Sequence, residues 1–66
     1  MTETTGEVLR RIRQEKGLSQ ITLAERIGGS CTQPRISLWE SGLEPSWLYH
    51  RLIVEALEVD ADEFGW

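Results

Sequence analysis

The residues of this chain best suited to recognition chemistry are Gln33 and Arg35, in the segment from Thr32 to Gly42, TQPRISLWESG. Glutamine and arginine carry paired hydrogen-bonding groups that match base edges in the major groove of DNA. Ile36 and Trp39, three residues apart, can point inward together from one side of a short helix. The residues left for the outer side are Gln33, Pro34, Arg35, Ser37, Leu38 and Ser41. The segment is therefore a candidate recognition helix.

The same segment also has a less specific interpretation. Taken alone it is a capped amphipathic helix, with Thr32 as a candidate N-cap and Gly42 as the stop. Gln33 and Arg35 would then be ordinary solvated side chains, and an exposed Leu38 would equally suit a contact with a partner protein. The position of this helix directly after another capped helix favours the DNA-binding interpretation.

The chain offers little for catalysis or for metal binding. His50 is the only histidine and Cys31 the only cysteine, so a zinc site lacks ligands and no internal disulfide can form. The serines have no histidine and aspartate arrangement for nucleophilic catalysis, and there is no glycine-rich phosphate loop. We therefore predict a protein that is not an enzyme and needs no metal, cofactor or small-molecule ligand. A lone cysteine suits the reducing cytoplasm.

The length of 66 residues allows one domain, residues 1–66, with a small hydrophobic core. The longest uninterrupted apolar run is three residues, so we expect neither a membrane span nor a signal peptide. No segment alternates apolar and polar residues with a period of two, so we expect no strand. The predicted fold class is all-α, with five short helices separated by clear start and stop signals.

The first two helices have strong local signals. Thr4, with Glu7 three residues later, is typical of a capping box, and the helix that follows stops at Gly17. Ser19 caps the second helix, which ends at the glycine pair 28–29. The apolar residues expected to point inward from these two helices are Val8, Leu9, Ile12, Leu23, Ala24 and Ile27.

Three further elements complete the expected fold. The third helix spans Gln33 to Ser41 and the fourth Trp47 to Leu57. Asp60 and Glu63 form a second box-like start for a last turn over Ala61 to Phe64. The residues expected to point inward from the fourth helix are Ile53, Val54 and Leu57.

The net charge of −4 is unevenly divided along the chain. Residues 1–36 carry six Lys or Arg against four acids, whereas residues 37–66 carry Arg51 alone against seven acids. This division suggests that the first half faces a polyanion and the second half faces away from it. Solvated charge on helix faces accounts for the same numbers, so charge alone does not decide between the two.

Three motifs stand in order along the chain: LRRIRQEKGLSQITLAERIG, ISLWESG and EALEVDADEF. Together they resemble the Xre-type helix-turn-helix family, the lambda-repressor-like DNA-binding domains of phage repressors and Cro. The resemblance covers roughly Val8 to Phe64. It implies a repressor-like transcriptional regulator, of phage or mobile-element style, that binds double-stranded DNA sequence-specifically with the helix Gln33–Ser41 in the major groove. Dimers on two half-sites are common in this family, and no cofactor is involved.

The resemblance also implies roles for individual residues. Gln20 matches a phosphate contact at the start of the second helix, where a helix N-terminus attracts anions. Gln33 and Pro34 match positions that meet base edges. Leu38 matches a further base-facing position, where leucine can only pack against a thymine methyl. Ser41 matches a position near the DNA backbone.

Other matches and departures concern structure and charge. Arg13 and Glu40 match a structural ion pair that ties the first helix to the third. The turn before the recognition helix, GGSCT, has two more residues than the usual turn. Leu43 and Glu44 stand where the family often has Lys or Arg, which implies weak non-specific affinity for DNA. Other departures are His50, in place of a packed leucine, and Glu58, in place of a C-cap glycine.

The C-terminal segment is richer in large apolar residues than one small core needs. These residues are Trp47, Leu48, Tyr49, Leu52, Phe64 and Trp66. Exposed aromatic patches usually mark interfaces. The residues that we expect at a homodimer contact are Trp47, Leu48, Phe64 and Trp66. Two alternatives remain: Trp66 merely folds over the last helix, or the scaffold is a protein-binding module, such as an antirepressor-like or antitoxin partner.

Overall fold

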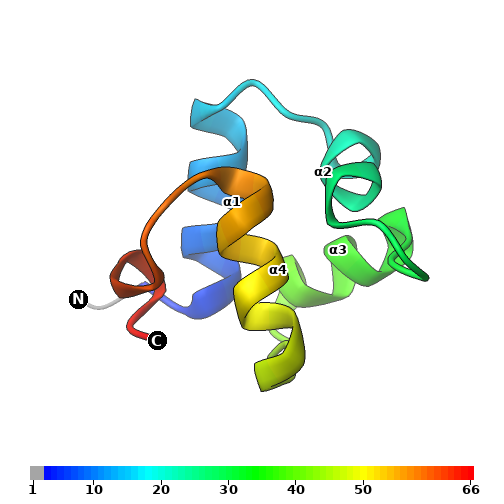
Figure 1. Ribbon diagram of the computed structural model, residues 1–66. Helices are drawn as coiled ribbons and strands as arrows, with labels where there is room; N and C mark the ends of the chain where they lie inside the picture. Colours follow the sequence, from blue (N-terminus) through cyan, green and yellow to red (C-terminus); the bar gives the residue numbers. More distant parts are fainter. Residues whose placement is uncertain (1–2) are drawn as a thin grey trace.

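The computed structural model describes residues 3–66 and consists of helices joined by short turns (Figure 1). The elements are α1 (Thr5–Glu15), α2 (Gln20–Ile27), α3 (Gln33–Ser41), α4 (Trp47–Leu57) and the 3-10 helix η1 (Ala61–Phe64). No strand occurs among these residues, so the all-α prediction is confirmed. None of the helices in this part of the chain is long and apolar enough to cross a membrane.

Local hydrogen bonds fix the starts of the first two helices. The Thr4 hydroxyl accepts a hydrogen bond from the Glu7 backbone N–H, and Glu7 Oε1 accepts one from the Thr4 N–H, which confirms the predicted capping box. The Ser19 hydroxyl accepts from the Thr22 N–H at the start of α2. These caps satisfy backbone donors that have no partner within the helix.

The later helices start where the sequence predicts but lack the expected side-chain caps. Thr32 stands at the N-cap of α3 without a side-chain capping bond. Asp60 makes no such bond before η1 either, so the predicted box with Glu63 is wrong. Short helices with weak local signals depend on packing for their stability. In α3 that packing comes from Ile36 and Trp39, which are buried.

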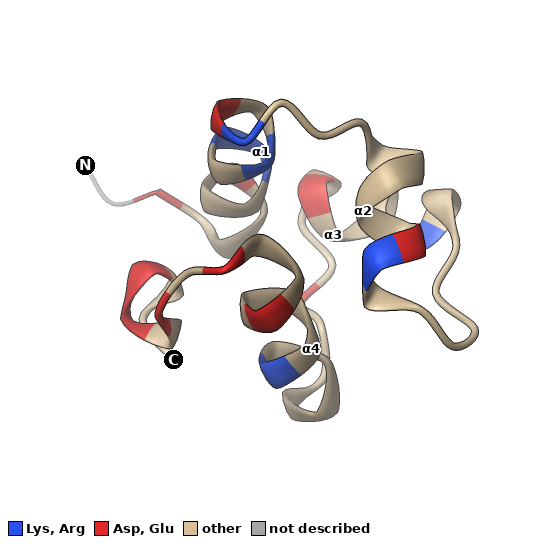
Figure 2. Ribbon diagram, turned by 45° about the horizontal axis from the view of Figure 1, so that its top comes forward, with Lys and Arg blue, Asp and Glu red and all other residues tan. Residues whose placement is uncertain are grey.

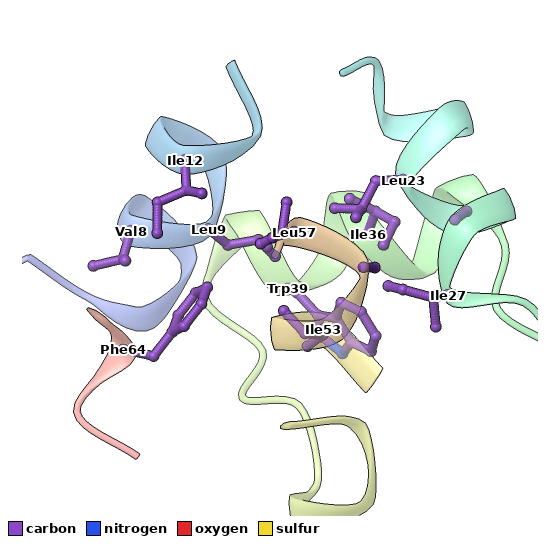
Figure 3. Packing of buried hydrophobic residues seen from close by; sticks show 12 residues of the cluster. Val8, Leu9, Ile12, Leu23, Ile27, Ile36, Trp39, Ile53, Leu57 and Phe64 are labelled. Atoms are coloured by element: carbon purple, nitrogen blue, oxygen red, sulfur yellow. The ribbon is translucent and has the colours of Figure 1, made fainter. Parts of the chain in front are cut away.

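One hydrophobic core joins all five elements, and Figure 3 shows Trp39 among the side chains that converge on it. Its buried members are Val8, Leu9, Ile12, Leu23, Ala24, Ile27, Ile36, Trp39, Ile53, Ala56, Leu57 and Phe64. Burial of apolar surface from every element is the main favourable contribution to folding. Because two side chains of α3 are held in this core, the opposite side of α3 is presented to solvent in a defined orientation.

The C-terminal residues fold back against α1 and α4, so that η1 lies beside α1 (Figure 1). Phe64 is only 9% exposed, and the Trp66 ring stacks on Phe64 and His50 with centroid distances of 4.3 and 3.7 Å. A single chain already covers most of Phe64, which leaves little of its ring for the contact between two copies that the sequence suggested. Trp66 is half-buried, and its ring lies over Phe64 of η1. This matches the alternative given above, in which Trp66 folds over the last helix.

Candidate nucleic-acid interface

A buried ion pair anchors α3 to α1. Arg13 Nε donates to Glu40 Oε2 at 2.6 Å and Arg13 Nη2 donates to Glu40 Oε1 at 3.1 Å. The two side chains are only 11% and 6% exposed. The third guanidinium nitrogen, Nη1, donates to the Leu18 carbonyl oxygen at 2.8 Å. Each of the three guanidinium nitrogens thus donates one hydrogen bond, and the pair holds the carboxylate in one position.

The carboxylate of Glu40 in turn positions two glutamines. Gln20 Nε2, at the start of α2, donates to Glu40 Oε1 at 3.1 Å. Gln33 Nε2, at the start of α3, donates to Gln20 Oε1 at 2.6 Å. A continuous series of hydrogen bonds, the Arg13–Gln33 relay, therefore runs from the α1–α3 junction to the first residue of α3.

The chemistry of the relay dictates which way each amide faces. An ionised carboxylate only accepts, so Gln20 must turn its NH₂ group toward Glu40. The side-chain oxygen of Gln20 then faces Gln33. Because this oxygen only accepts, Gln33 must donate to it from its own NH₂ group. Gln33 keeps its Oε1 and its second N–H free of the relay, and it is half-buried at the edge of the fold. One acceptor and one donor thus remain beside each other for a ligand.

The outer side of α3 continues from Gln33 with Pro34 and Leu38, both exposed. Leu38 is 54% exposed, and its carbonyl accepts a hydrogen bond from the N–H of Leu43, itself 55% exposed. The Ser41 hydroxyl donates to the carbonyl oxygen of Ser37 at 2.8 Å. This part of the surface is therefore less polar than the sequence pattern suggested, and Leu43 belongs with it.

Arg35 lies apart from the relay. Two residues correspond to about 200° around a helix, so Arg35 leaves α3 on a different side from Gln33. Its guanidinium carbon is 5.3 Å from the centre of the Tyr49 ring of α4, a cation–π distance. The Tyr49 ring also packs edge-on against Trp39. Sequence reasoning included Arg35 but missed Tyr49, because no spacing rule connects residues on two helices.

Charge is distributed less favourably for a polyanion than the sequence halves suggest. Figure 2 shows Lys and Arg on α1 and α2 and acidic residues near the C-terminus. Several of these cations are paired, Arg11 with Glu3 at 3.1 Å and Arg26 with Glu58 at 3.8 Å. Arg13 is buried in its ion pair. The charge available to phosphates is thus smaller than the count of basic residues.

The fold and this surface define a small helical domain whose second and third helices are joined by a turn and present two coupled glutamines. A helix-turn-helix family model matches residues 9–64. Because the match covers most of the chain, the chain belongs to the helix-turn-helix family, of the Xre and lambda-repressor-like type, whose members bind DNA. No curated protein and no solved structure matched the chain.

Proposed function

We propose that this protein is a repressor-like transcriptional regulator that recognises a specific double-stranded DNA sequence with α3 in the major groove. The observation that carries the proposal is the Arg13–Gln33 relay, which fixes the Gln33 amide at the exposed start of α3. A side chain that is already held in one orientation loses less conformational entropy on binding than a freely rotating one. It also presents its donor and acceptor in a fixed order, so it discriminates better between bases.

The free groups of Gln33 match adenine. In the major groove adenine offers the N6 amino group as a donor and N7 as an acceptor, and guanine offers two acceptors. Gln33 presents one acceptor, Oε1, and one remaining donor on Nε2, because its other Nε2 hydrogen is bonded to Gln20. The preferred half-site therefore contains an adenine opposite Gln33, and guanine there leaves the Oε1 facing an acceptor.

The neighbouring residues complete the contact. Pro34 and Leu38 offer apolar surface, for which a thymine methyl is the matching group in the major groove. Gln20 and Ser41 lie at the ends of helices and suit the DNA backbone, where contacts position the protein without reading sequence. Arg35, held on Tyr49, adds positive charge beside the groove and affects all duplexes alike.

The proposal includes a low affinity for non-specific DNA. Leu43 and Glu44 follow α3, and both are exposed. A carboxylate at this position repels phosphate, and few unpaired cations release few counterions on binding. Binding should therefore weaken only gradually as salt is raised. We also propose that the protein acts without a cofactor or catalytic activity, in the cytoplasm.

A protein-binding role is the second candidate. Leu38 and Leu43 are 54% and 55% exposed on the surface that we assign to DNA, with Glu44 beside them. Exposed leucines next to an acidic residue suit a basic protein partner as well as a duplex.

Selection of binding sequences from random duplexes at low salt tests the proposal. Wild type and Gln33→Ala are carried through in parallel. The DNA-binding proposal predicts a short motif with an adenine that wild type enriches and Gln33→Ala no longer requires. A wild-type pool that stays random would contradict it and favour the protein-binding role.

A further inference from the structure

Arg35 leaves α3 on the flank that faces α4. Ile36 and Trp39 mark the inner side of α3, where both are buried, and Arg35 is exposed. With its side chains an α-helix is about 10–12 Å across, which nearly fills the major groove of about 12 Å. Residues on the flanks of a helix in this groove therefore come close to the phosphates of the two strands. Arg35 is placed near the strand on the α4 side.

The charge of Arg35 is not neutralised by another residue of the described chain. The arginines that form ion pairs within residues 3–66 are Arg11, Arg13, Arg26 and Arg51. Arg35 instead has its guanidinium carbon 5.3 Å from the centre of the Tyr49 ring. A planar guanidinium can rest one face on an aromatic ring and still donate from the N–H groups in its own plane. Arg35 can therefore bind a phosphate without leaving Tyr49.

The Tyr49 ring is itself held in place by the core. It packs edge-on against the Trp39 ring, with the two centroids 5.0 Å apart and an angle of 63° between the planes. Trp39 is only 2% exposed and belongs to α3, as Arg35 does. The series of contacts thus runs from the buried side of α3 to Tyr49 of α4 and back to the exposed flank of α3. Arg35 rests on a support whose position relative to α3 is fixed.

We propose that Tyr49 is a positioning residue for DNA binding, which holds the Arg35 guanidinium where it meets a phosphate on the α4 side of the major groove. This inference rests on the proposed function. An arginine side chain loses rotamer freedom when it is fixed on a phosphate. Because the Tyr49 ring already removes part of that freedom, less is lost on binding. A phosphate contact carries no sequence information, so Tyr49 affects every duplex alike.

Binding to a random duplex over a series of salt concentrations tests the proposal. Arg35→Ala should weaken binding and lower the slope of log affinity against log salt concentration by about one, because one phosphate contact is lost. Tyr49→Leu should weaken binding about two- to fivefold, the size of an exposed cation–π contact. Tyr49→Phe keeps an aromatic face and should bind like wild type. In the Arg35→Ala background, Tyr49→Leu should cause no further loss.

The double variant and Tyr49→Phe separate positioning from packing. Tyr49→Leu also removes the contact with the Trp39 ring, and thermal unfolding measures the stability lost in this way. An equal loss of affinity from Tyr49→Leu with and without Arg35 would assign the effect to packing and overturn the proposal. An unchanged salt slope in Arg35→Ala, or a Tyr49→Phe protein as weak as Tyr49→Leu, would also overturn it. Stronger binding by Tyr49→Leu would show that the ring withholds Arg35 from DNA, which is the opposite of the proposal.

Failure of this inference is distinguishable from failure of the proposed function. The ratio of affinities for the selected and the random duplex should keep its wild-type value in all these variants, because Gln33 is unchanged. A wild type with a preferred sequence but no coupling between Arg35 and Tyr49 would overturn this inference alone. A wild type that binds random duplex without a preferred sequence would contradict the proposed function, while the coupling is still measured on that duplex. A wild type that binds no duplex at all would overturn both.

Discussion

Arg13 and Glu40 are 27 residues apart in sequence, yet their side chains meet at 2.6 Å in the interior between α1 and α3. The same carboxylate holds Gln20, which holds Gln33. The ion pair thus serves stability and also determines how the first residue of α3 faces its ligand.

Removing one partner of this pair strands the other charge in a buried position. We expect Arg13→Ala and Glu40→Ala each to lower the free energy of unfolding by about 3–5 kcal/mol. The double variant should lose much less than the sum of the two, because neither charge is left alone. Urea unfolding of the three variants measures the coupling. Losses that simply add would show that the two side chains act independently.

At Gly6 the backbone of α1 lies close to the backbone of α3. A Cβ atom there would lie 2.4 Å from the Trp39 carbonyl oxygen and 2.9 Å from that of Glu40. Gly6→Ala would normally favour a helix by about 0.5–1 kcal/mol. Here the backbone clash dominates, and we expect a net loss of about 1–3 kcal/mol in thermal unfolding. Gln14→Ala, on the exposed side of α1, is the matched control and should be neutral or stabilising. A Gly6→Ala protein as stable as that control would contradict the close helix contact.

Glu58 is the one non-glycine residue with a positive φ in residues 3–66, at 59°. It ends α4 in the left-handed conformation, where glycine has no steric cost. We expect Glu58→Gly to stabilise the fold by about 0.5–1 kcal/mol, in spite of losing its exposed contact with Arg26. Glu58→Ala removes the same carboxylate but keeps the strain, so it should not stabilise. Equal melting temperatures for the glycine and alanine variants would contradict the assignment.

Burial raises the pKa of the Cys31 thiol above its ordinary value, and the nearby Arg35 partly opposes this shift. A raised thiol pKa means less thiolate at a given pH, and the thiolate is the reactive form. The alkylation rate should therefore rise with pH around a higher midpoint in the folded protein than in an unfolded peptide with the same local sequence. Arg35→Ala should move the midpoint further up. A midpoint at or below that of the peptide would show that the thiol is not shielded.

Much of the fold could be predicted because its signals are local. Thr4 with Glu7 and the Ser19 cap mark helix starts within a few residues of sequence, and the predicted bounds of α3 and α4 coincide with those observed. For Phe64 the sequence is less informative, for a physical reason. An apolar count shows that large side chains are present, but it does not show whether the chain end folds back to bury them.

The candidate site could be predicted only as a set of residues. The family resemblance selected Gln20, Gln33 and Glu40, but the contacts between them depend on how α1, α2 and α3 meet in space. The structure also changes the expectation for Gln20, for which the family resemblance implies a phosphate contact alone. Because Gln20 holds the Gln33 amide, Gln20→Ala should lower sequence discrimination as well as affinity.

The most direct test of the central claim is the ratio of affinities of wild type and Gln33→Ala for the selected duplex and for random duplex DNA at one fixed salt concentration. If the relay presents Gln33 to an adenine, Gln33→Ala should reduce this ratio by about 5-fold to 150-fold, corresponding to about 1–3 kcal/mol. Glu44→Lys is the control, because it should strengthen binding to both duplexes alike and leave the ratio unchanged. A ratio that is the same for wild type and Gln33→Ala would contradict the claim that Gln33 reads sequence.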